Sequence, residues 1–93
     1  MLTWYRFNED LDKAPTSEGV YFLSETASEK GIVYVGKADG IDGIRQRLSQ
    51  HPDPNNPCLQ RKAIKYFAYE ETNNSEERER ELKRDYNPEC NRD

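Results

Sequence analysis

The pattern of apolar and polar positions along the chain predicts three β-strands. Two runs, residues 19–25 (GVYFLSE) and 31–37 (GIVYVGK), are rich in β-branched and aromatic residues and begin at glycine, a composition typical of strands. The segment between them is short, so we expect the two runs to form an antiparallel hairpin. A third strand is expected over residues 64–71 (IKYFAYEE), where the alternation in polarity is weak.

The first predicted helix spans about residues 42–51. Ile41, Ile44 and Leu48 recur with helical spacing and are expected to form its buried face. The proline-rich segment that follows ends the helix, because proline cannot continue it. Upstream, residues 8–18 are polar and are expected to form a connector with one helical turn.

Two further helices complete the pattern. A short one begins at residues 56–57, where an asparagine cap precedes a proline at the first helical position. The last covers about residues 75–86 and ends before a second Asn-Pro pair. Because three short strands need helices packed on them to form a core, we predict an α+β fold: one domain over residues 1–93, with a small three-stranded antiparallel sheet flanked by helices.

Composition agrees with a single compact domain. The chain has 93 residues, of which 33% are hydrophobic and 34% charged. No apolar run approaches the ~20 residues of a membrane span, and the N-terminal residues have no signal-peptide character. Cys58 and Cys90 are 32 positions apart, which suggests neither a metal site nor a disulfide framework. We therefore expect a cytoplasmic protein with reduced cysteines.

The charge is distributed unevenly along the chain. The net charge of −4 argues by itself against nucleic-acid binding. Residues 37–68, however, carry six basic and three acidic groups, whereas residues 1–36 and 69–93 are both acidic. The middle third is thus a basic region within an acidic protein.

The last predicted helix contains one glutamate on its apolar side. Its apolar positions are Leu82 and Tyr86, and Glu79 lies about 60° from the first and about 20° from the second around the helix. The other glutamates of this helix lie about 100° or more from Leu82. A carboxylate beside a core needs a partner. Glu79 is therefore either one half of a salt bridge or a functional group such as a metal ligand.

Basic residues flank the apolar stripe of the first helix. Arg47 and His51 are four positions apart and share a face, while Arg45 lies on the other flank. A guanidinium at the edge of a core suits phosphate binding, or its stem simply covers apolar surface. In the hairpin, Tyr21 and Tyr34 are by default packing residues.

The order of these residues resembles that of the GIY-YIG nuclease family. The tripeptides 19–21 (GVY) and 34–36 (YVG) stand where the family has GIY and YIG. Arg47 stands at the position of the family's catalytic arginine and His51 at that of a histidine found in many members. A short insertion before this helix leaves Arg45 as an alternative. Lys37 matches a lysine seen in part of the family.

The resemblance continues to the end of the chain and covers about residues 14–92. In the family's last helix a glutamate precedes a proline by nine positions and an asparagine by twelve. Glu79, Pro88 and Asn91 satisfy both spacings. The orientation of Glu79 on the helix selects the same glutamate independently.

The resemblance implies a DNA endonuclease that hydrolyses phosphodiester bonds with one divalent metal ion, Mg²⁺ or Mn²⁺. RNA is not excluded as a substrate, and a partner protein or a homodimer is expected to supply specificity. The alternative is a non-catalytic nucleic-acid-binding or interaction module on the same scaffold. The implied site comprises Tyr21, Tyr34, Arg47, His51 and Glu79 for catalysis, Glu79 also as metal ligand, and Lys37, Arg45 and Asn91 for substrate binding.

Overall fold

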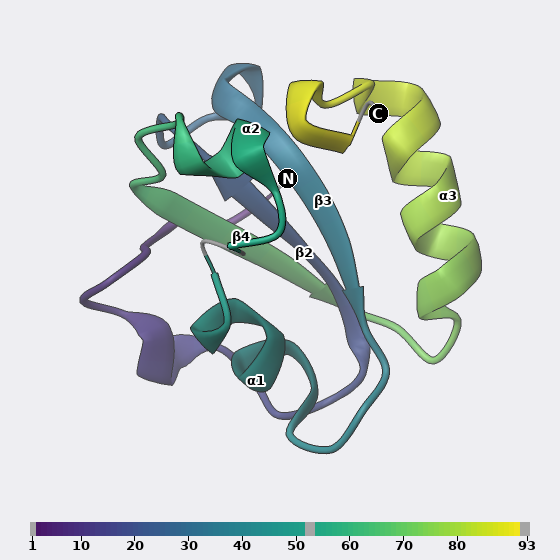
Figure 1. Cartoon of the computed structure of the whole chain (residues 1–93). Coiled ribbons are helices and arrows are strands. Elements are labelled where there is room, and N and C mark those ends of the chain that lie inside the picture. Colours follow the sequence, from purple (N-terminus) through teal and green to yellow (C-terminus); the bar gives the residue numbers. More distant parts are fainter. Residues whose placement is uncertain (1, 52–53, 92–93) are drawn as a thin grey trace.

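The computed structural model describes residues 2–51 and 54–91, and its centre is an antiparallel sheet (Figure 1). The sheet has four strands in the order β1-β4-β2-β3. The strands are β1 Tyr5–Arg6, β2 Gly19–Ser24, β3 Ile32–Ala38 and β4 Tyr66–Glu71. The three predicted strands are confirmed to within two residues. The prediction of only three strands is wrong, because β1 adds to the free side of β4.

The central strand β2 is buried along its whole length. It pairs with β3 on one side and with β4 on the other, so neither of its edges meets solvent. Its two faces are both covered, which explains why its sequence is a continuous apolar run rather than an alternating one. In this register Tyr21 lies opposite Gly36, and Leu23 lies opposite Tyr34.

The helices cover both faces of the sheet (Figure 1). They are α1 Gly43–Ser49, α2 Pro57–Gln60 and α3 Ser75–Tyr86, and short 3₁₀ turns occupy Leu11–Lys13, Glu29–Gly31 and Glu89–Asn91. Ile44 and Leu48 of α1 pack with Tyr21 and Leu23 on one face, called here the α1 face. Leu82 of α3 packs with the oppositely directed residues of β2 on the other, the α3 face.

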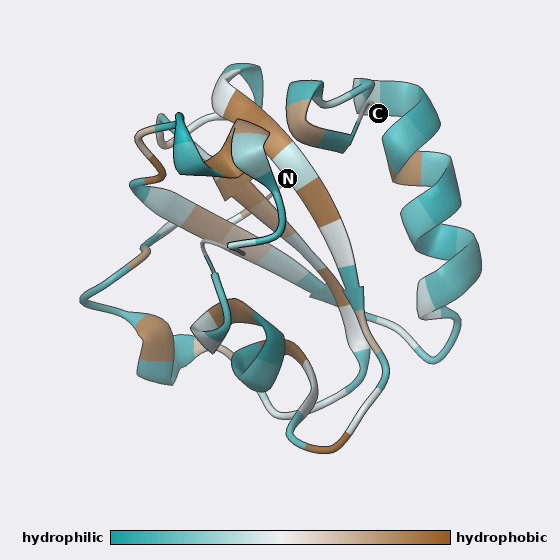
Figure 2. Ribbon diagram, viewed as in Figure 1, coloured by the Kyte–Doolittle hydropathy of each residue, from teal (hydrophilic) through white to brown (hydrophobic). Residues whose placement is uncertain are grey.

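The two faces differ in the helix that covers them. Figure 2 shows α3 as hydrophilic along nearly all of its length, and Leu82 is its buried aliphatic residue, at 4% exposure. On the α1 face, Ile44, Leu48 and Leu59 are all 1% exposed or less. The α1 face therefore holds the larger apolar core.

The start of α1 is anchored to the N-terminal connector. Asp42 and Gly43 both have positive φ, and a Cβ on Gly43 would lie 2.0 Å from the carbonyl oxygen of Ser17. The amide of Ile44 donates to that same oxygen at 3.0 Å. This turn starts the helix at residue 43, so the expected burial of Ile41 is wrong, and its side chain is 89% exposed.

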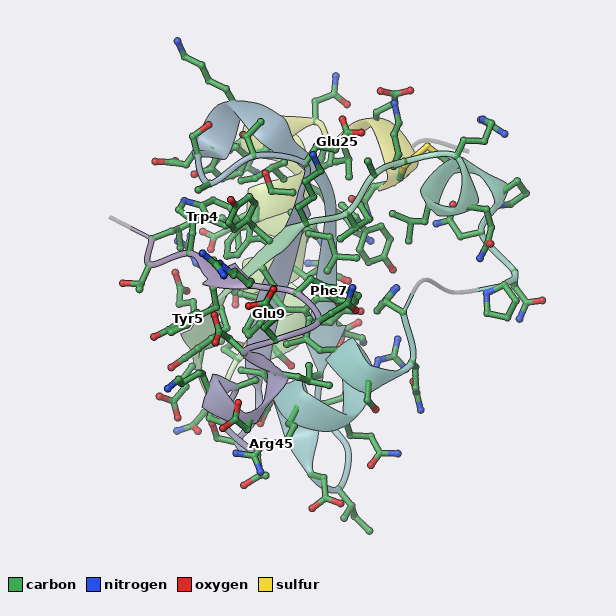
Figure 3. The ribbon with its side chains drawn as sticks, turned by 90° about the vertical axis from the view of Figure 1, so that its left-hand side faces the viewer. Trp4, Tyr5, Phe7, Glu9, Glu25 and Arg45 are labelled. Atoms are coloured by element: carbon green, nitrogen blue, oxygen red, sulfur yellow. A yellow bond between two sulfur atoms is a disulfide. The ribbon has the colours of Figure 1, made fainter. Side chains whose placement is uncertain are left out.

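A disulfide bond joins Cys58 of α2 to Cys90 near the C-terminus, with a Cα–Cα distance of 5.3 Å. It is the yellow bond in Figure 3. The expectation of unpaired cysteines is wrong, because the spacing of 32 residues does not reveal that β4 and α3 return the chain to α2. Disulfides persist in oxidising environments, so the cysteines no longer support the predicted cytoplasmic location.

Candidate active site

Tyr21, Tyr34 and His51 form one cluster on the α1 face. The hydroxyl of Tyr21 and Nε2 of His51 are 2.7 Å apart, a hydrogen bond. The imidazole centroid lies 5.4 Å from both tyrosine rings, and the two tyrosine rings lie 6.2 Å apart. The sheet and the end of α1 thus bring together three residues that are far apart in the sequence.

Gly36 makes room for this cluster. It pairs with Tyr21 across the β2–β3 ladder. A Cβ on Gly36 would lie 2.3 Å from Cζ and 2.4 Å from the hydroxyl oxygen of Tyr21. Side-chain carbon atoms do not approach that closely, so the ring of Tyr21 can lie across β3 only because this position is glycine.

The last turn of α1 positions Arg47 and His51. Leu48 is fully buried and fixes the rotation of the helix, so that Arg47 projects at the exposed edge. The amide of His51 donates to the carbonyl of Leu48 at 3.2 Å, which keeps the residue in a helical path just past the end of α1. The side chain of Arg47 also interacts with Tyr21.

A polar cavity of about 240 Å³ adjoins this cluster. It is smaller than the ~300–1,000 Å³ of typical small-molecule sites, a size suited to one phosphate group and its waters. The sequence patterns do not single out Gln50 and Asn55, and their position near His51 in the chain is the only signal for them. The lining residues are Arg47, Gln50, His51, Pro54 and Asn55.

Burial determines the protonation of Tyr21. The residue is fully buried, which raises the pKa of its hydroxyl above the usual 10. The neighbouring Tyr34 adds to this effect, and Arg47 opposes it only in part. Tyr21 therefore keeps its proton near neutral pH, and its hydroxyl shares a hydrogen bond with Nε2 of His51.

Glu79 lies on the other face of the sheet, on α3. Its side chain is 17% exposed, and one carboxylate oxygen lies 3.6 Å from Nζ of Lys83. Viewed along the helix axis, Arg78 lies on one side of Leu82 and Glu79 on the other. Because Arg78 bonds to Glu70 of β4, Glu79 is on the flank toward β3. The expected orientation of Glu79 toward the packed side of α3 is confirmed. The residue that pairs with its carboxylate is Lys83 of the same helix.

Lys37 also lies on the α3 face. Side chains alternate between the two faces of a strand, and Val35 packs with Leu82 on the α3 face. Lys37, two residues further along β3, therefore points to that face, and its Nζ lies 3.8 Å from a carboxylate oxygen of Asp39. The predicted site is thus divided by the edge strand β3 into the tyrosine–histidine cluster and the pair Glu79 and Lys37.

Arg45 and Asn91 have structural partners. Arg45 donates to the backbone oxygens of Ala14 at 2.8 Å and Asp12 at 3.0 Å, and Figure 3 shows it beside the N-terminal segment. Asn91 accepts from the amide of Val35 at 2.8 Å and donates to its carbonyl at 2.9 Å, so it pairs with the edge of β3. These contacts favour Arg47 over Arg45 as the arginine available to a substrate.

The chemistry of Glu79 suits a hard divalent cation. Mg²⁺ commonly takes one or two carboxylates and keeps several of its waters, so one partly accessible glutamate is a sufficient protein ligand. Within residues 2–51 and 54–91, no group of three or more His, Cys, Asp or Glu side chains could hold a metal ion. Any metal bound here would therefore depend on Glu79, water and substrate oxygens.

Comparisons with models of protein families, with curated proteins and with solved structures give no match for this chain. The resemblance to GIY-YIG nucleases therefore remains a prediction from the sequence. Among the described residues, no helix has the length and apolar character needed to cross a membrane.

Proposed function

We propose that this domain is a metal-dependent endonuclease that hydrolyses phosphodiester bonds in DNA. The observation that carries the proposal is the convergence of Tyr21, Tyr34 and His51 beside Arg47 and a small polar cavity. These residue types can orient a water molecule and neutralise a phosphate. The charge of the chain fits this assignment, since residues 37–68 form its basic third.

Arg47 is the phosphate-binding residue in this proposal. It is exposed at the end of α1 and lines the cavity together with His51. Its guanidinium can donate two parallel hydrogen bonds to phosphate oxygens. It would neutralise charge that develops on the scissile phosphate.

Tyr34 is the stronger candidate for handling the attacking water. Burial holds the pKa of Tyr21 high, which disfavours Tyr21 as a proton acceptor. Tyr34 is only half-buried and packs against the same imidazole. We assign Tyr21 to the orientation of His51, and we assign Tyr34 to the orientation of the attacking water.

Glu79 would hold the metal ion. A bound Mg²⁺ or Mn²⁺ would stabilise negative charge on the leaving oxygen. Glu79 and Lys37 lie on the opposite face of the edge strand β3 from the tyrosine–histidine cluster. A nucleic-acid strand that crosses β3 would therefore contact both the cluster and these two residues. Lys37, at the end of β3, would then contribute to backbone binding.

The isolated domain is expected to bind duplex DNA weakly and with a strong dependence on salt. If about three to five basic side chains contact phosphates, the slope of log K against log salt is about −0.9 per contact. Nonspecific affinity at physiological salt would be about 10⁻⁴–10⁻⁶ M. Tight or sequence-specific binding of DNA would then require a partner protein, a dimer or a distorted substrate.

The test is cleavage of supercoiled plasmid, with structured RNA in parallel, in the presence and absence of Mg²⁺. Arg47→Ala should lower the rate by about 10²–10³-fold, the usual effect of losing one charge donor. Glu79→Gln should abolish cleavage. Tyr34→Phe should lower the rate more than Tyr21→Phe.

Matched variants separate chemistry from folding. Glu76→Gln makes the same change on the exposed side of α3, and Arg84→Ala removes an exposed arginine of the same helix. Both should cleave at the wild-type rate, and every variant other than Tyr21→Phe should keep the wild-type melting curve. Absence of metal-dependent cleavage by the wild-type chain, with retained DNA binding, would favour the non-catalytic module. Loss of cleavage in Glu76→Gln but not in Glu79→Gln would contradict the metal assignment.

A further inference from the structure

A second and larger cavity lies beside β4 and α3, and none of the residues of the tyrosine–histidine cluster line it. Its volume is about 410 Å³, within the range of ~300–1,000 Å³ typical of binding sites. It is bounded by the N-terminal residues, β4 and α3 (Figure 3 shows Tyr5 on the N-terminal segment). The proposed nuclease activity makes no use of it.

Four aromatic residues contribute to the lining of this cavity. Tyr5 and Tyr69 stack with their ring centroids 5.9 Å apart and an interplanar angle of 12°. Phe22 meets Tyr86 edge to face at 6.1 Å. Aromatic rings attract a cation that lies within about 6 Å of a ring centre, and Tyr86, which is only partly buried, is the ring next to Glu29.

The charged groups of the cavity are predominantly acidic. Glu29, Glu70 and Arg78 line it, and Glu81 lies beside Arg78. Arg78 donates to both oxygens of Glu70, at 2.6 and 3.1 Å, and to Glu81 at 3.4 Å. The positive charge of Arg78 is thus already compensated, and these four groups together carry two net negative charges.

The carboxylate of Glu29 is held at the mouth of the cavity by Tyr86, whose hydroxyl donates to it. This bond raises the pKa of Tyr86 to about 12, so the hydroxyl stays neutral. An ionised carboxylate can accept about four hydrogen bonds, which leaves Glu29 with capacity for a further donor. A neutral aromatic wall beside such a carboxylate is suited to a guanidinium or an ammonium group.

We propose that this cavity receives an arginine or lysine side chain of a partner protein. Charge complementarity supports this occupant, because residues 69–93, which include α3, carry nine acidic and five basic groups. The same balance disfavours an anionic ligand, such as a phosphate or an acidic peptide. A partner docked on the α3 face would leave the tyrosine–histidine cluster accessible. The inference does not depend on nuclease activity.

The test is an NMR titration of ¹⁵N-labelled full-length chain with the blocked tripeptide acetyl-Gly-Arg-Gly-amide. Saturable shifts should appear at amides around Tyr69 and Tyr86, with an affinity of about 1 mM, which corresponds to the ~4 kcal/mol expected for one anchored side chain. The isosteric peptide with neutral citrulline in place of arginine should bind about 3- to 10-fold more weakly, since it lacks the charge. Acetyl-Gly-Glu-Gly-amide should not bind.

Glu29→Gln tests the carboxylate itself. Glutamine can still accept from Tyr86, so the wall stays in place while the charge is lost, and arginine-peptide affinity should fall about 3-fold or more. Glu76→Gln is the matched control and should bind as the wild type does. Equal binding of the arginine and citrulline peptides, equal effects of the two variants, or shifts confined to residues around the tyrosine–histidine cluster would overturn the proposal.

Discussion

The two faces of the sheet are covered in different ways. On the α1 face, Ile44, Leu48 and Leu59 are buried with Tyr21 and form a closed apolar core. On the α3 face, one leucine of a highly charged helix packs on the sheet, and the ion pair of Arg78 with Glu70 links this helix to β4.

The two faces also differ in charge and in the space they leave open. Segment 37–68, which includes α1 and α2, is basic, whereas segment 69–93, which includes α3, is acidic. A small polar cavity lies beside Arg47 at the end of α1, and a larger one lies beside Glu29 and Glu70, next to α3. The two proposed sites would therefore recognise ligands of opposite charge.

The largest effect on stability is expected from matched leucine truncations on the two faces. Leu48→Ala removes a side chain that is fully buried in the larger core and should lower the free energy of unfolding by about 3–5 kcal/mol. Leu82→Ala should cost about 2–3 kcal/mol, because Leu82 has fewer apolar neighbours and its site can collapse or admit water. Urea unfolding followed by circular dichroism measures both values.

The two leucine variants also test how independent the faces are. Leu82→Ala should increase hydrogen exchange mainly in α3, while Leu48→Ala should affect the whole sheet. A larger loss for Leu82→Ala than for Leu48→Ala would show that α3 is the more important support of the fold.

The disulfide bond joins α2 to the 3₁₀ turn that follows α3 and should have the next largest effect. Cys58 and Cys90 are separated by 32 residues, a segment that includes β4 and α3. Closing a loop of this length stabilises a protein by about 3–4 kcal/mol in the chain-entropy model. The double variant Cys58→Ser/Cys90→Ser should lose about that amount in urea unfolding, and dithiothreitol should have the same effect on the wild type. Wild-type stability that does not respond to reductant would contradict this.

Secondary structure was predictable from the sequence where its signal is local. Strand β2 is an unbroken run of apolar and aromatic residues, and α3 lies between polar caps, so both were predictable. Strand β1 contains only Tyr5 and Arg6, which is too short for any periodicity. The disulfide depends on a return of the chain that no local pattern encodes.

The candidate site was only partly predictable for the same reason. Helical geometry alone placed Glu79 on the packed side of α3, because the apolar positions of that helix define one direction. Strand alternation could also have placed Lys37 on the face opposite Tyr34. The roles of Arg45 and Asn91 in holding backbone groups required the tertiary structure, since their partners lie 31 and 56 positions away.

Alkaline pH should act on the two faces through different tyrosines. Burial raises the pKa of Tyr21 on the α1 face, and the bond to Glu29 raises that of Tyr86 on the α3 face to about 12. Above pH ~10 the unfolded chain releases these protons while the folded chain retains them. The stability present below pH ~10 should therefore fall as pH rises, by up to about 1.4 kcal/mol per pH unit for the buried Tyr21 and by less for Tyr86, whose bond to Glu29 is exposed to solvent.

Tyr21→Phe separates the two contributions. It should lose about 1 kcal/mol at neutral pH, with the hydrogen bond to His51, and should lose less stability than the wild type between pH 10 and 12. Tyr86→Phe should reduce the same slope while leaving the His51 resonances unchanged. Identical slopes in the wild type and Tyr21→Phe would show that Tyr21 titrates normally.

The smallest effect on stability, and the clearest test of Glu79, is expected from Lys83→Met. The two side chains form an i,i+4 pair at 3.6 Å, and Lys83 is 41% exposed, so the loss should be below about 0.5 kcal/mol. If Glu79 is a metal ligand, removing a competing cation should strengthen Mn²⁺ binding by the isolated chain, measured by water proton relaxation. Arg84→Met, which removes an exposed arginine that pairs with Asp85, should change neither quantity. A loss above 1 kcal/mol with unchanged Mn²⁺ affinity would identify Glu79 as half of a structural salt bridge.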